Sequence, residues 1–370
     1  MSRNTMPKNL MRALAFCGAI ALSLSPFSTS AAEPAKAALK VAFVYVSPVG
    51  QAGWSYQHDL GRREMLRALD GQAKATVVEA VAEGADAERV MRDLAAQGHQ
   101  LIFATSFGYL EPALKVAADF PAVKFEHAGG YKTAANLGTY DSRYYEARYL
   151  AGMVAGHGSK SGVAGYVAGF PVPEVVQGIN AFALGMLAVN PQAQVKVVWL
   201  NSWFDPARER DAALTLVNQG ADVLTNHSGS PAVPLVAEEK GVKLLAYQSD
   251  MSAFAPHAQL AAVTHQWGAF YTRTAREVLA GQWRPQAVWG GMREGQVRLS
   301  ALSKTLPAEV TKSVLAKEKE IVAGRFVPFS GQLVDNHGQI KQTGGTMADA
   351  QIAQMNWFVQ GVVGSVPAMR

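Results

Sequence analysis

Short apolar runs alternate with amphipathic stretches along the first part of the chain. The runs expected to form strands are Leu39–Val46, Ala75–Glu79, Leu101–Thr105 and Val123–His127, and stretches with apolar residues at helical spacing lie near residues 57–70, 85–97 and 111–119. Strands that alternate with helices in this way build βαβ units, whose strands run parallel. The pattern therefore predicts an α/β lobe in which helices flank a mostly parallel sheet.

The same alternation starts again after residues 136–141. Strands are expected at Gly162–Val167, Val195–Leu200, Asp222–Asn226 and Lys243–Tyr247, with helices near residues 174–190, 206–219 and 230–240. A strand at Ala261–Thr264 and a helix at Trp267–Ala280 are expected to return the chain to the first lobe. Two similar lobes joined by several crossings form a clamshell, whose strand-end loops enclose a cleft.

The length fits two lobes, because 370 residues exceed what one hydrophobic core usually organises. The expected division is residues 1–32 as a signal peptide, 38–140 with about 265–300 as lobe I, 141–264 with about 301–345 as lobe II, and 346–370 as a C-terminal helix. Near the end, residues 309–322 are typical of a charged surface helix, residues 329–344 of a strand and turn, and residues 347–362 of an amphipathic helix.

The first 32 residues resemble an export signal. Arg3, Lys8 and Arg12 precede an apolar run from Ala13 to Leu24, and small residues lead up to Ala32, where cleavage is expected. We therefore expect a periplasmic protein. Lipoprotein anchoring at Cys17, the single cysteine, is less favoured, because Phe16 stands where a small residue is needed.

The composition limits the classes of partner that the protein is expected to bind. The signal holds three basic and no acidic residues, so its removal lowers the formal charge from +5 to +2. No cluster of lysine and arginine remains in the mature chain, which argues against nucleic acid and acidic membrane surfaces. No later segment reaches about 18 uninterrupted apolar residues, so no membrane span is expected. We expect a monomer.

Aromatic residues recur at the strand-end loops, where small polar residues are the usual choice. They are Trp54 and Tyr56 after the first strand, Phe107, Phe170, Trp203 and, at a later strand-to-helix junction, Trp267. Stacking on aromatic rings is worth roughly 1–3 kcal/mol per base, and amide or carboxylate groups can read the ring's edge. The loops therefore favour a planar ligand, although each ring could instead cap the hydrophobic core.

Several segments resemble the basic membrane protein family of bacterial substrate-binding proteins, which includes purine nucleoside receptors of ABC importers. The segments that carry the resemblance are Val44–Gly50, Glu146–Gly152, Gly165–Gly169, Asn201–Pro206 and Gln219–Asp222. The resemblance extends from Lys40 to about Ser300. It implies a purine held between Tyr56, or its neighbour Trp54, and Trp203, with Asp250 where the family has an acidic residue that binds ribose hydroxyls.

Departures from the family pattern bear on the ligand. Nucleoside receptors of the family have a first loop of the form Asp-Lys-Ser-Phe-Asn, where this chain reads Gly53-Trp-Ser-Tyr-Gln57, and His265-Gln266-Trp267 replaces the neighbourhood of an expected lysine. Fewer donors for hydroxyls and bulkier rings favour a free base, such as adenine, over a nucleoside.

Groups that could read the edge of the base follow from their positions near the predicted cleft. The candidates are Asp141, Arg143, Tyr144, Glu126 and Gln248. Asp141 and Arg143 could equally form an ion pair at the lobe crossing. Glu146, at the start of a helix, could face a lysine or arginine across the lobe.

Catalytic and metal-binding motifs are missing from the sequence. It has no phosphate-binding Gly-x-x-x-x-Gly-Lys-Ser/Thr loop, no Gly-x-Ser-x-Gly elbow and no His-x-x-x-His pair among its eight histidines. We therefore expect no enzyme, no cofactor and no metal. The leading hypothesis is a receptor that delivers its ligand to an inner-membrane ABC permease. The alternatives are a ligand-sensing domain for a membrane receptor and an exported nucleoside hydrolase, although the aspartate cluster of a hydrolase is missing.

Overall fold

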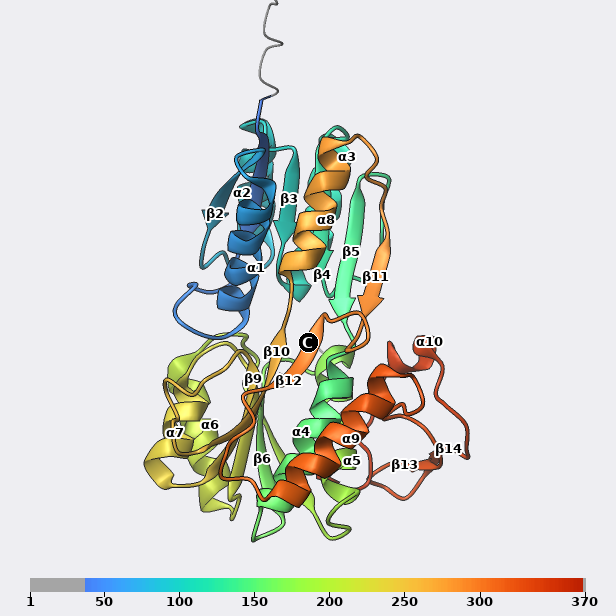
Figure 1. Cartoon of the computed structure of the whole chain (residues 1–370). Coiled ribbons are helices and arrows are strands. Elements are labelled where there is room, and N and C mark those ends of the chain that lie inside the picture. Colours follow the sequence, from blue (N-terminus) through green and yellow to red (C-terminus); the bar gives the residue numbers. More distant parts are fainter. Residues whose placement is uncertain (1–36, 369–370) are drawn as a thin grey trace, which may run out of the picture. The chain divides into compact units, whose positions relative to one another are not determined.

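The computed structural model describes residues 37–368, so the predicted signal peptide and Cys17 lie outside the described residues. Contacts divide the chain into residues 1–37 and a compact unit of residues 38–370. Within this unit, two sheets flanked by helices (Figure 1) confirm the predicted α/β architecture.

All neighbouring strands of the first sheet are parallel, and their order is β11-β5-β4-β3-β1-β2. The bounds are β1 Leu39–Val44, β2 Ala73–Val78, β3 Leu101–Ala104, β4 Lys124–Ala128, β5 Leu137–Ser142 and β11 Ala287–Gly290. The helices are α1 Trp54–Leu69, α2 Ala85–Ala96, α3 Leu110–Asp119 and α8 Gly268–Leu279, with a short 3-10 helix at Phe107–Tyr109. We call this sheet and these helices the first lobe.

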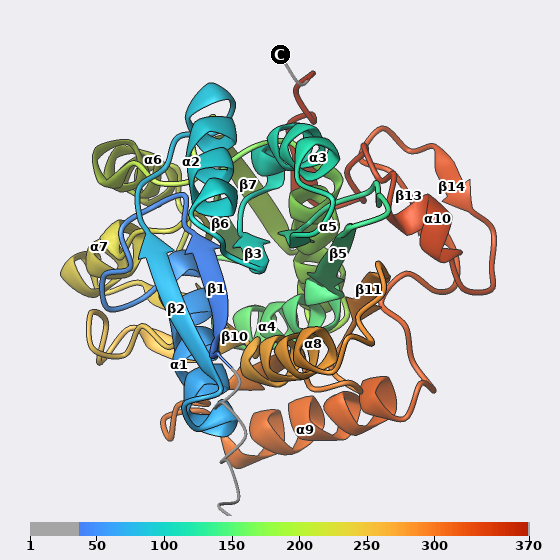
Figure 2. The same cartoon turned by 90° about the horizontal axis from the view of Figure 1, so that it is seen from above.

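Alternation along the strands explains why helices cover both faces of this sheet. Val41 and Phe43 of β1 pack in the same cluster as Met65 of α1, whereas Ala42 and Val44 pack with α2 and α3. Successive side chains of a strand point to opposite faces, so an unbroken apolar run requires cover on both sides. Figure 2 shows α2 and α3 on one side of these strands and α1 and α8 on the other.

The second sheet has the order β12-β10-β9-β8-β6-β7-β15, and only β12 runs antiparallel to its neighbour. The bounds are β6 Val163–Ala168, β7 Gln194–Trp199, β8 Val223–His227, β9 Lys243–Gln248, β10 Gln259–His265, β12 Val297–Ser300 and β15 Val362–Val363. The helices are α4 Tyr144–Gly158, α5 Pro173–Leu187, α6 Pro206–Asn218, α7 Ala232–Lys240 and α9 Ala308–Val322. These elements form the second lobe.

Helix starts in the second lobe follow from local sequence. Asp205 caps α6 by accepting the Arg208 backbone N–H at 3.0 Å, and Pro206 occupies the first turn. Pro173 likewise occupies the first turn of α5. Proline suits this position because its missing N–H would have no helical partner there.

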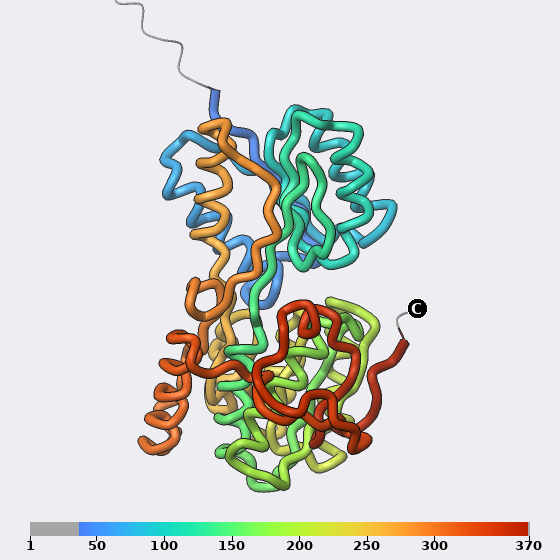
Figure 3. The backbone as a smooth tube through the Cα atoms, turned by 90° about the vertical axis from the view of Figure 1, so that its right-hand side faces the viewer, coloured from blue at the N-terminus to red at the C-terminus, as the bar shows by residue number. Residues whose placement is uncertain are grey.

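Three connections join the lobes, and Figure 3 shows the chain running between the two groups of elements at these places. They follow β5, β10 and β11. The strand predicted at Ala261–Thr264 pairs with β9 in the second sheet, and only the following helix, α8, lies in the first lobe. Similarly, β12 joins the second sheet although residues 265–300 were assigned to lobe I. The exact lobe boundaries stay a prediction.

The helix predicted over residues 347–362, and with it the C-terminal helix of 346–370, is wrong. Only α10, Asp349–Ile352, is helical there, and a hairpin of β13 (Leu333–Val334) and β14 (Ile340–Gln342) precedes it. Met355, Phe358, Val359 and Val362 have helical spacing and are all buried, but in irregular chain and an edge strand. Tertiary bonds replace the helical ones: Asn180 binds the Trp357 carbonyl at 2.8 Å and the Val359 N–H at 3.0 Å.

In the described part of the chain, no helix combines the length and apolar character needed to cross a membrane.

Candidate functional site

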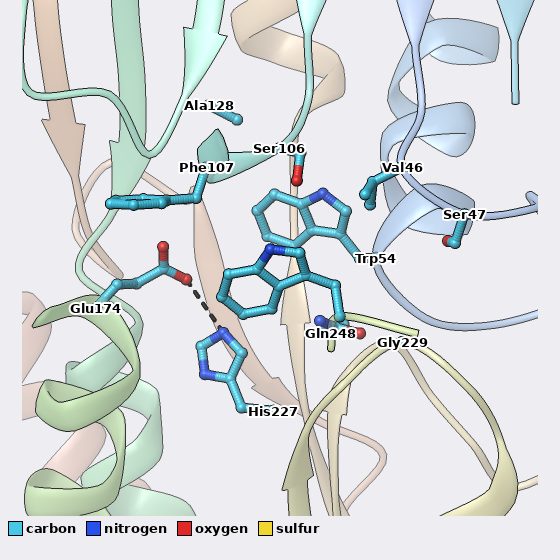
Figure 4. Close-up of a pocket in the computed structure, with 11 residues that line it drawn as sticks. Val46, Ser47, Trp54, Ser106, Phe107, Ala128, Glu174, His227, Gly229 and Gln248 are labelled. Atoms are coloured by element: carbon cyan, nitrogen blue, oxygen red, sulfur yellow. Dashed lines mark ion pairs between the residues drawn. The ribbon is translucent and has the colours of Figure 1, made fainter. Parts of the chain in front are cut away.

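A cavity lies where strand ends of both sheets meet, and it contains about 460 Å³ of space between atoms, part of it open to solvent. Its lining comes from both lobes (Figure 4) and consists of Val46, Ser47, Trp54, Ser106, Phe107, Ala128, Glu174, Trp203, His227, Gly229 and Gln248. Ligands of open parallel sheets bind beyond the carboxyl ends of the strands, so this is the expected place for a site.

The first-lobe wall of the cavity is neutral and aromatic. Trp54, the first residue of α1, donates its indole Nε1–H to the Thr105 carbonyl at 2.6 Å. The Ser106 hydroxyl donates to the Glu83 carboxylate at 2.6 Å, and Phe107 follows it along the chain. Because these donors bind groups of their own lobe, the wall is held in shape whether or not a ligand is present.

Trp203 forms part of the second-lobe wall and also links the lobes. Its Nε1 donates to Glu83 at 3.1 Å, and the same carboxylate oxygen accepts the Ser106 hydroxyl and, at 2.8 Å, the Gly108 N–H. Phe170 packs edge-on against Trp203 with ring centroids 4.9 Å apart. Phe170 therefore supports the wall from behind and does not line the cavity.

A second contact between the lobes needs glycine. Gly53 has a φ of +92°, and a Cβ placed on it would stand 2.2 Å from the Gly229 carbonyl oxygen. The Gly53 N–H donates to the Ser249 hydroxyl at 2.7 Å. A side chain at this position would both strain the backbone and separate the two loops.

Glu174 places a carboxylate in the second-lobe wall. It lies in the first turn of α5, its side chain is 14% exposed, and its Oε1 lies 3.2 Å from His227 Nε2 (Figure 4). Burial raises the pKa of Glu174 to about 7, with the nearby Arg148 acting in the opposite direction. Burial, and then the charge of Arg148, holds the pKa of His227 well below its ordinary value, so this imidazole is neutral.

Arg148 and Asp141 complete the charges around Glu174. Arg148 is fully buried, donates to the Asn226 carbonyl at 2.6 Å and lies over the Tyr247 ring at 3.4 Å. Burial, and then repulsion by Glu174, raises the pKa of Asp141 well above its ordinary value. The group thus places one buried cation near two carboxyls, each of which has a raised pKa.

Gln248 contributes an unsatisfied acceptor. It ends β9 with a φ of +70°, and its Oε1 is buried without a partner among the described residues. Strained backbone and an unpaired polar atom are both costly, and both concentrate at functional sites.

The structure brings together four of the nine predicted binding residues: Trp54, Phe107, Trp203 and Gln248 line the cavity. Asp141 is not in the lining, although its charge and that of Glu174 interact. Tyr56, Asp250 and Trp267 border a separate groove.

The placement of Tyr56 follows from the start of α1. The helix begins at Trp54, three residues before the predicted start, and residues two apart on a helix point about 200° from each other. Asp250 is exposed and accepts from Gln259 at 2.8 Å, while buried Trp267 stacks on His58 with centroids 5.2 Å apart.

Tyr144, another candidate for reading the base, is buried outside the lining and packs on the His265 ring with centroids 4.5 Å apart. The remaining candidates have structural partners. Arg143 pairs with Asp349 at 2.6 Å, not with Asp141. Glu126 accepts the Trp283 indole N–H at 2.8 Å. Glu146 accepts the Met292 backbone N–H at 2.7 Å, and the charges of Arg143 and Arg293 lie near enough to act on it.

Glu174 was missed from the sequence, although its position was a usable signal. It follows Pro173 at a helix start directly after a strand-end loop, where an acidic residue gains from the helix dipole. His227 ends β8, and no motif in the sequence singles it out. In the described residues, no group of three or more histidines, cysteines or acidic residues is placed to hold a metal ion.

Comparison with known proteins adds the following findings. The family model described as "ABC transporter substrate-binding protein PnrA-like" matches residues 38–327. A purine-binding protein of Brucella abortus is 46% identical over 93% of this chain and 99% of its own length. A putative ABC transporter glucose-binding protein of Haloferax volcanii is 38% identical over 89% of this chain and 82% of its own length.

Solved structures agree on the fold. An ABC transporter solute-binding protein from Conexibacter woesei matches with a TM-score of 0.63 at 21% identity, covering 78% of this chain and 98% of that one. One from Aeropyrum pernix matches with a TM-score of 0.66 at 19% identity, covering 78% and 93%. The predicted clamshell of two lobes, each with a mostly parallel sheet, is confirmed, and it is the type I periplasmic binding-protein fold.

Proposed function

Because the chain belongs to the PnrA-like family of ABC transporter substrate-binding proteins, we propose that it binds a purine nucleobase, with adenine as the leading ligand, between its two lobes. Members of this family are binding proteins, not enzymes, and they supply small molecules to membrane permeases. We propose that this chain acts as a monomer in the periplasm after loss of residues 1–32, with anchoring at Cys17 as the less favoured arrangement. Its partner is an ABC permease of the inner membrane.

One observation carries the proposal: two indoles from opposite lobes, Trp54 and Trp203, line a single cavity together with Phe107. Rings on two walls suit a flat ligand, since each face of a base can stack on an aromatic side chain. Only the arrangement with the lobes together offers both rings to one ligand, so binding favours closure.

A free base is supported over a nucleoside. Asp250, the residue expected to hold ribose hydroxyls, lies in a separate groove, where it binds Gln259. The contacts between Gly53 and Gly229 and between Glu83 and Trp203 narrow the space next to the cavity. A sugar attached to the base would need both room and hydroxyl partners there.

The name of the Haloferax volcanii relative favours a second candidate, a hexose. Aromatic walls also suit sugar rings, but the several hydroxyl groups of a hexose need many free polar partners. In this lining, the indole and hydroxyl donors already bind protein groups. The purine is therefore the better match. A ligand-sensing role would use the same cavity with a different membrane partner.

Calorimetry with adenine, adenosine and glucose tests the proposal. We expect adenine to bind most tightly. A preference for adenosine would overturn the assignment to a free base, and a preference for glucose would overturn the assignment to purines. Mass spectrometry of the small molecule that copurifies with the protein provides an independent identification.

A further inference from the structure

The hydrogen-bonding groups of the cavity are unequally used. Trp54 Nε1, Trp203 Nε1 and the Ser106 hydroxyl all donate to protein groups, and the Ser47 and Ser55 hydroxyls share a hydrogen bond of 2.7 Å. The groups left over include acceptors on the second-lobe wall. The buried Gln248 Oε1 has no partner, and Glu174 Oε2 makes no hydrogen bond to the described residues.

The position of Glu174 makes it more than a surface acid. Its Oε1 faces His227 Nε2 at 3.2 Å, and the close-up shows its carboxylate between that imidazole and the Phe107 ring (Figure 4). A neutral imidazole with its proton on Nε2 donates to the carboxylate and fixes its orientation. The second oxygen, Oε2, is then the one available to a ligand.

The loop at Gly129 lies beside the carboxylate of Glu174. A Cβ built on Gly129 would lie 3.5 Å from Glu174 Oε2 and 3.8 Å from the Phe107 ring, which are ordinary contact distances. Because a carboxylate oxygen only accepts, the ligand atom that binds Oε2 must carry a hydrogen. Replacing the hydrogen of such an N–H by a methyl group or a sugar would remove the donor and leave the carboxylate unpaired.

We infer that Glu174 is the specificity-determining residue of the site: its Oε2 accepts a hydrogen bond from an N–H of the bound heterocycle, and the site thereby selects unsubstituted, donor-bearing bases. This inference rests on the proposed function. A hydrogen bond to a charged acceptor is stronger than a neutral one, and an acceptor built for an N–H rejects an analogue without it. Gln248 Oε1 offers a second acceptor, which is uncharged.

The charge of Glu174 depends on its neighbours. The titratable and charged groups that face it from the packed elements are His227, Arg148, Tyr144, Asp141, Tyr166 and Tyr247. The tyrosines stay neutral because burial raises the pKa of each, and Arg148 supplies the compensating positive charge. Since the pKa of Glu174 itself is about 7, the carboxylate predominates above that pH.

The test is calorimetry of the full mature chain with adenine, 9-methyladenine and N6,N6-dimethyladenine, at about pH 8.5. Glu174→Gln keeps the shape of the side chain and removes the charge. Glu126→Gln is the matched control, because it is also a buried carboxyl with a raised pKa but binds Trp283 away from the cavity. Thermal melting of both variants checks that they fold.

We expect Glu174→Gln to weaken adenine by about 10- to 100-fold, and Glu126→Gln to leave its affinity within about 2-fold of wild type. Wild type should bind at least one of the methylated analogues more weakly than adenine by a similar factor. The Glu174→Gln substitution should weaken binding of that analogue little further. Adenine affinity of wild type should also fall as the pH is lowered from about 8.5 to about 5.5, with a flatter profile for Glu174→Gln.

The possible outcomes separate the role of Glu174 from the assignment of a purine ligand. Suppose that wild type binds adenine and that Glu174→Gln binds it equally well, or discriminates among the three bases as wild type does. Either result overturns the role of Glu174 and leaves the purine assignment intact. If wild type binds none of the three bases, both are overturned.

Discussion

The two walls of the cavity face the same space but carry different chemistry. The first-lobe wall has Trp54 and Phe107, and its polar donors bind groups of the same lobe. The second-lobe wall has Trp203 together with a carboxylate, a neutral imidazole and an unpaired amide oxygen on strained backbone. Shape is thus built mainly on one side and recognition chemistry on the other.

The difference indicates how binding and closure are linked. A ligand can stack on the first-lobe wall without disturbing any hydrogen bond there. The edge of the ligand can bind the second-lobe wall only when the lobes close. The interactions that identify the ligand are therefore gained in the closed arrangement. Differential contact of this kind is what shifts a population between two states.

Preventing the walls from meeting should have the largest effect. Gly53→Ala adds a Cβ that would stand 2.2 Å from the Gly229 carbonyl, a clash that no side-chain rotation relieves. We expect adenine affinity to fall by at least about 100-fold, because the clash holds the two loops apart and disfavours the closed arrangement that binds the ligand. Gly50→Ala is the matched control: it also has a positive φ, of +57°, but no atom lies within 4 Å of its Cβ position. Equal affinities of the two variants by calorimetry would contradict the proposed contact.

Removing one ring from either wall should have the next largest effect. Trp54→Ala and Trp203→Ala should each weaken adenine by about 1–3 kcal/mol, the usual value of a stacked base. Trp357→Ala, at a half-buried tryptophan of the C-terminal segment, should leave affinity unchanged. If Trp203→Ala binds as well as wild type, the ring does not contact the ligand.

The buried carboxyl of Glu126 should make the stability of the protein depend on pH. Burial raises the pKa of Glu126 from 4.5 to about 8, opposed by its hydrogen bond from Trp283. The folded state therefore holds a proton that the unfolded chain loses near pH 4.5. This contribution to stability is complete below pH 4.5 and is lost as the pH rises through about 8. Between about pH 5 and pH 9, the melting temperature of Glu126→Gln should fall less than that of wild type. Parallel melting curves would show that Glu126 does not titrate in this way.

The smallest effects should come from the separate groove. Tyr56→Ala and Asp250→Asn change residues that lie outside the cavity, so both should bind adenine within about 2-fold of wild type. A large loss in either variant, measured by the same calorimetry, would move the ligand toward that groove and support the family-based assignment of Tyr56 and Asp250.

Much of the fold could be predicted because strand and helix periods differ clearly in the α/β repeats. The predicted strands of both sheets are confirmed to within a few residues. The segment after Met347 could not be predicted, because its apolar residues have helical spacing. The hydrogen-bond partners of its backbone, such as Asn180, are far away in the sequence. Gly361 and Gly364, with positive φ, were the available warning.

The candidate site was predictable only as far as strand ends reveal it. Aromatic residues at these ends pointed to Trp54, Phe107 and Trp203, which the cavity brings together. Choosing between Trp54 and Tyr56 required the true start of α1, because a helix turns them to different sides. Glu174 depends on β8 and α4 supplying His227 and Arg148, and no local pattern encodes that packing.

The hydrogen bonds of the Glu83 carboxylate should affect the fluorescence of the protein. One of its three donors is the Trp203 indole from the opposite lobe, so any separation of the lobes breaks that bond while the other two persist. Indole emission is sensitive to polarity and to nearby charge. Opening and closing should therefore be visible as a change in intrinsic fluorescence, without any attached dye.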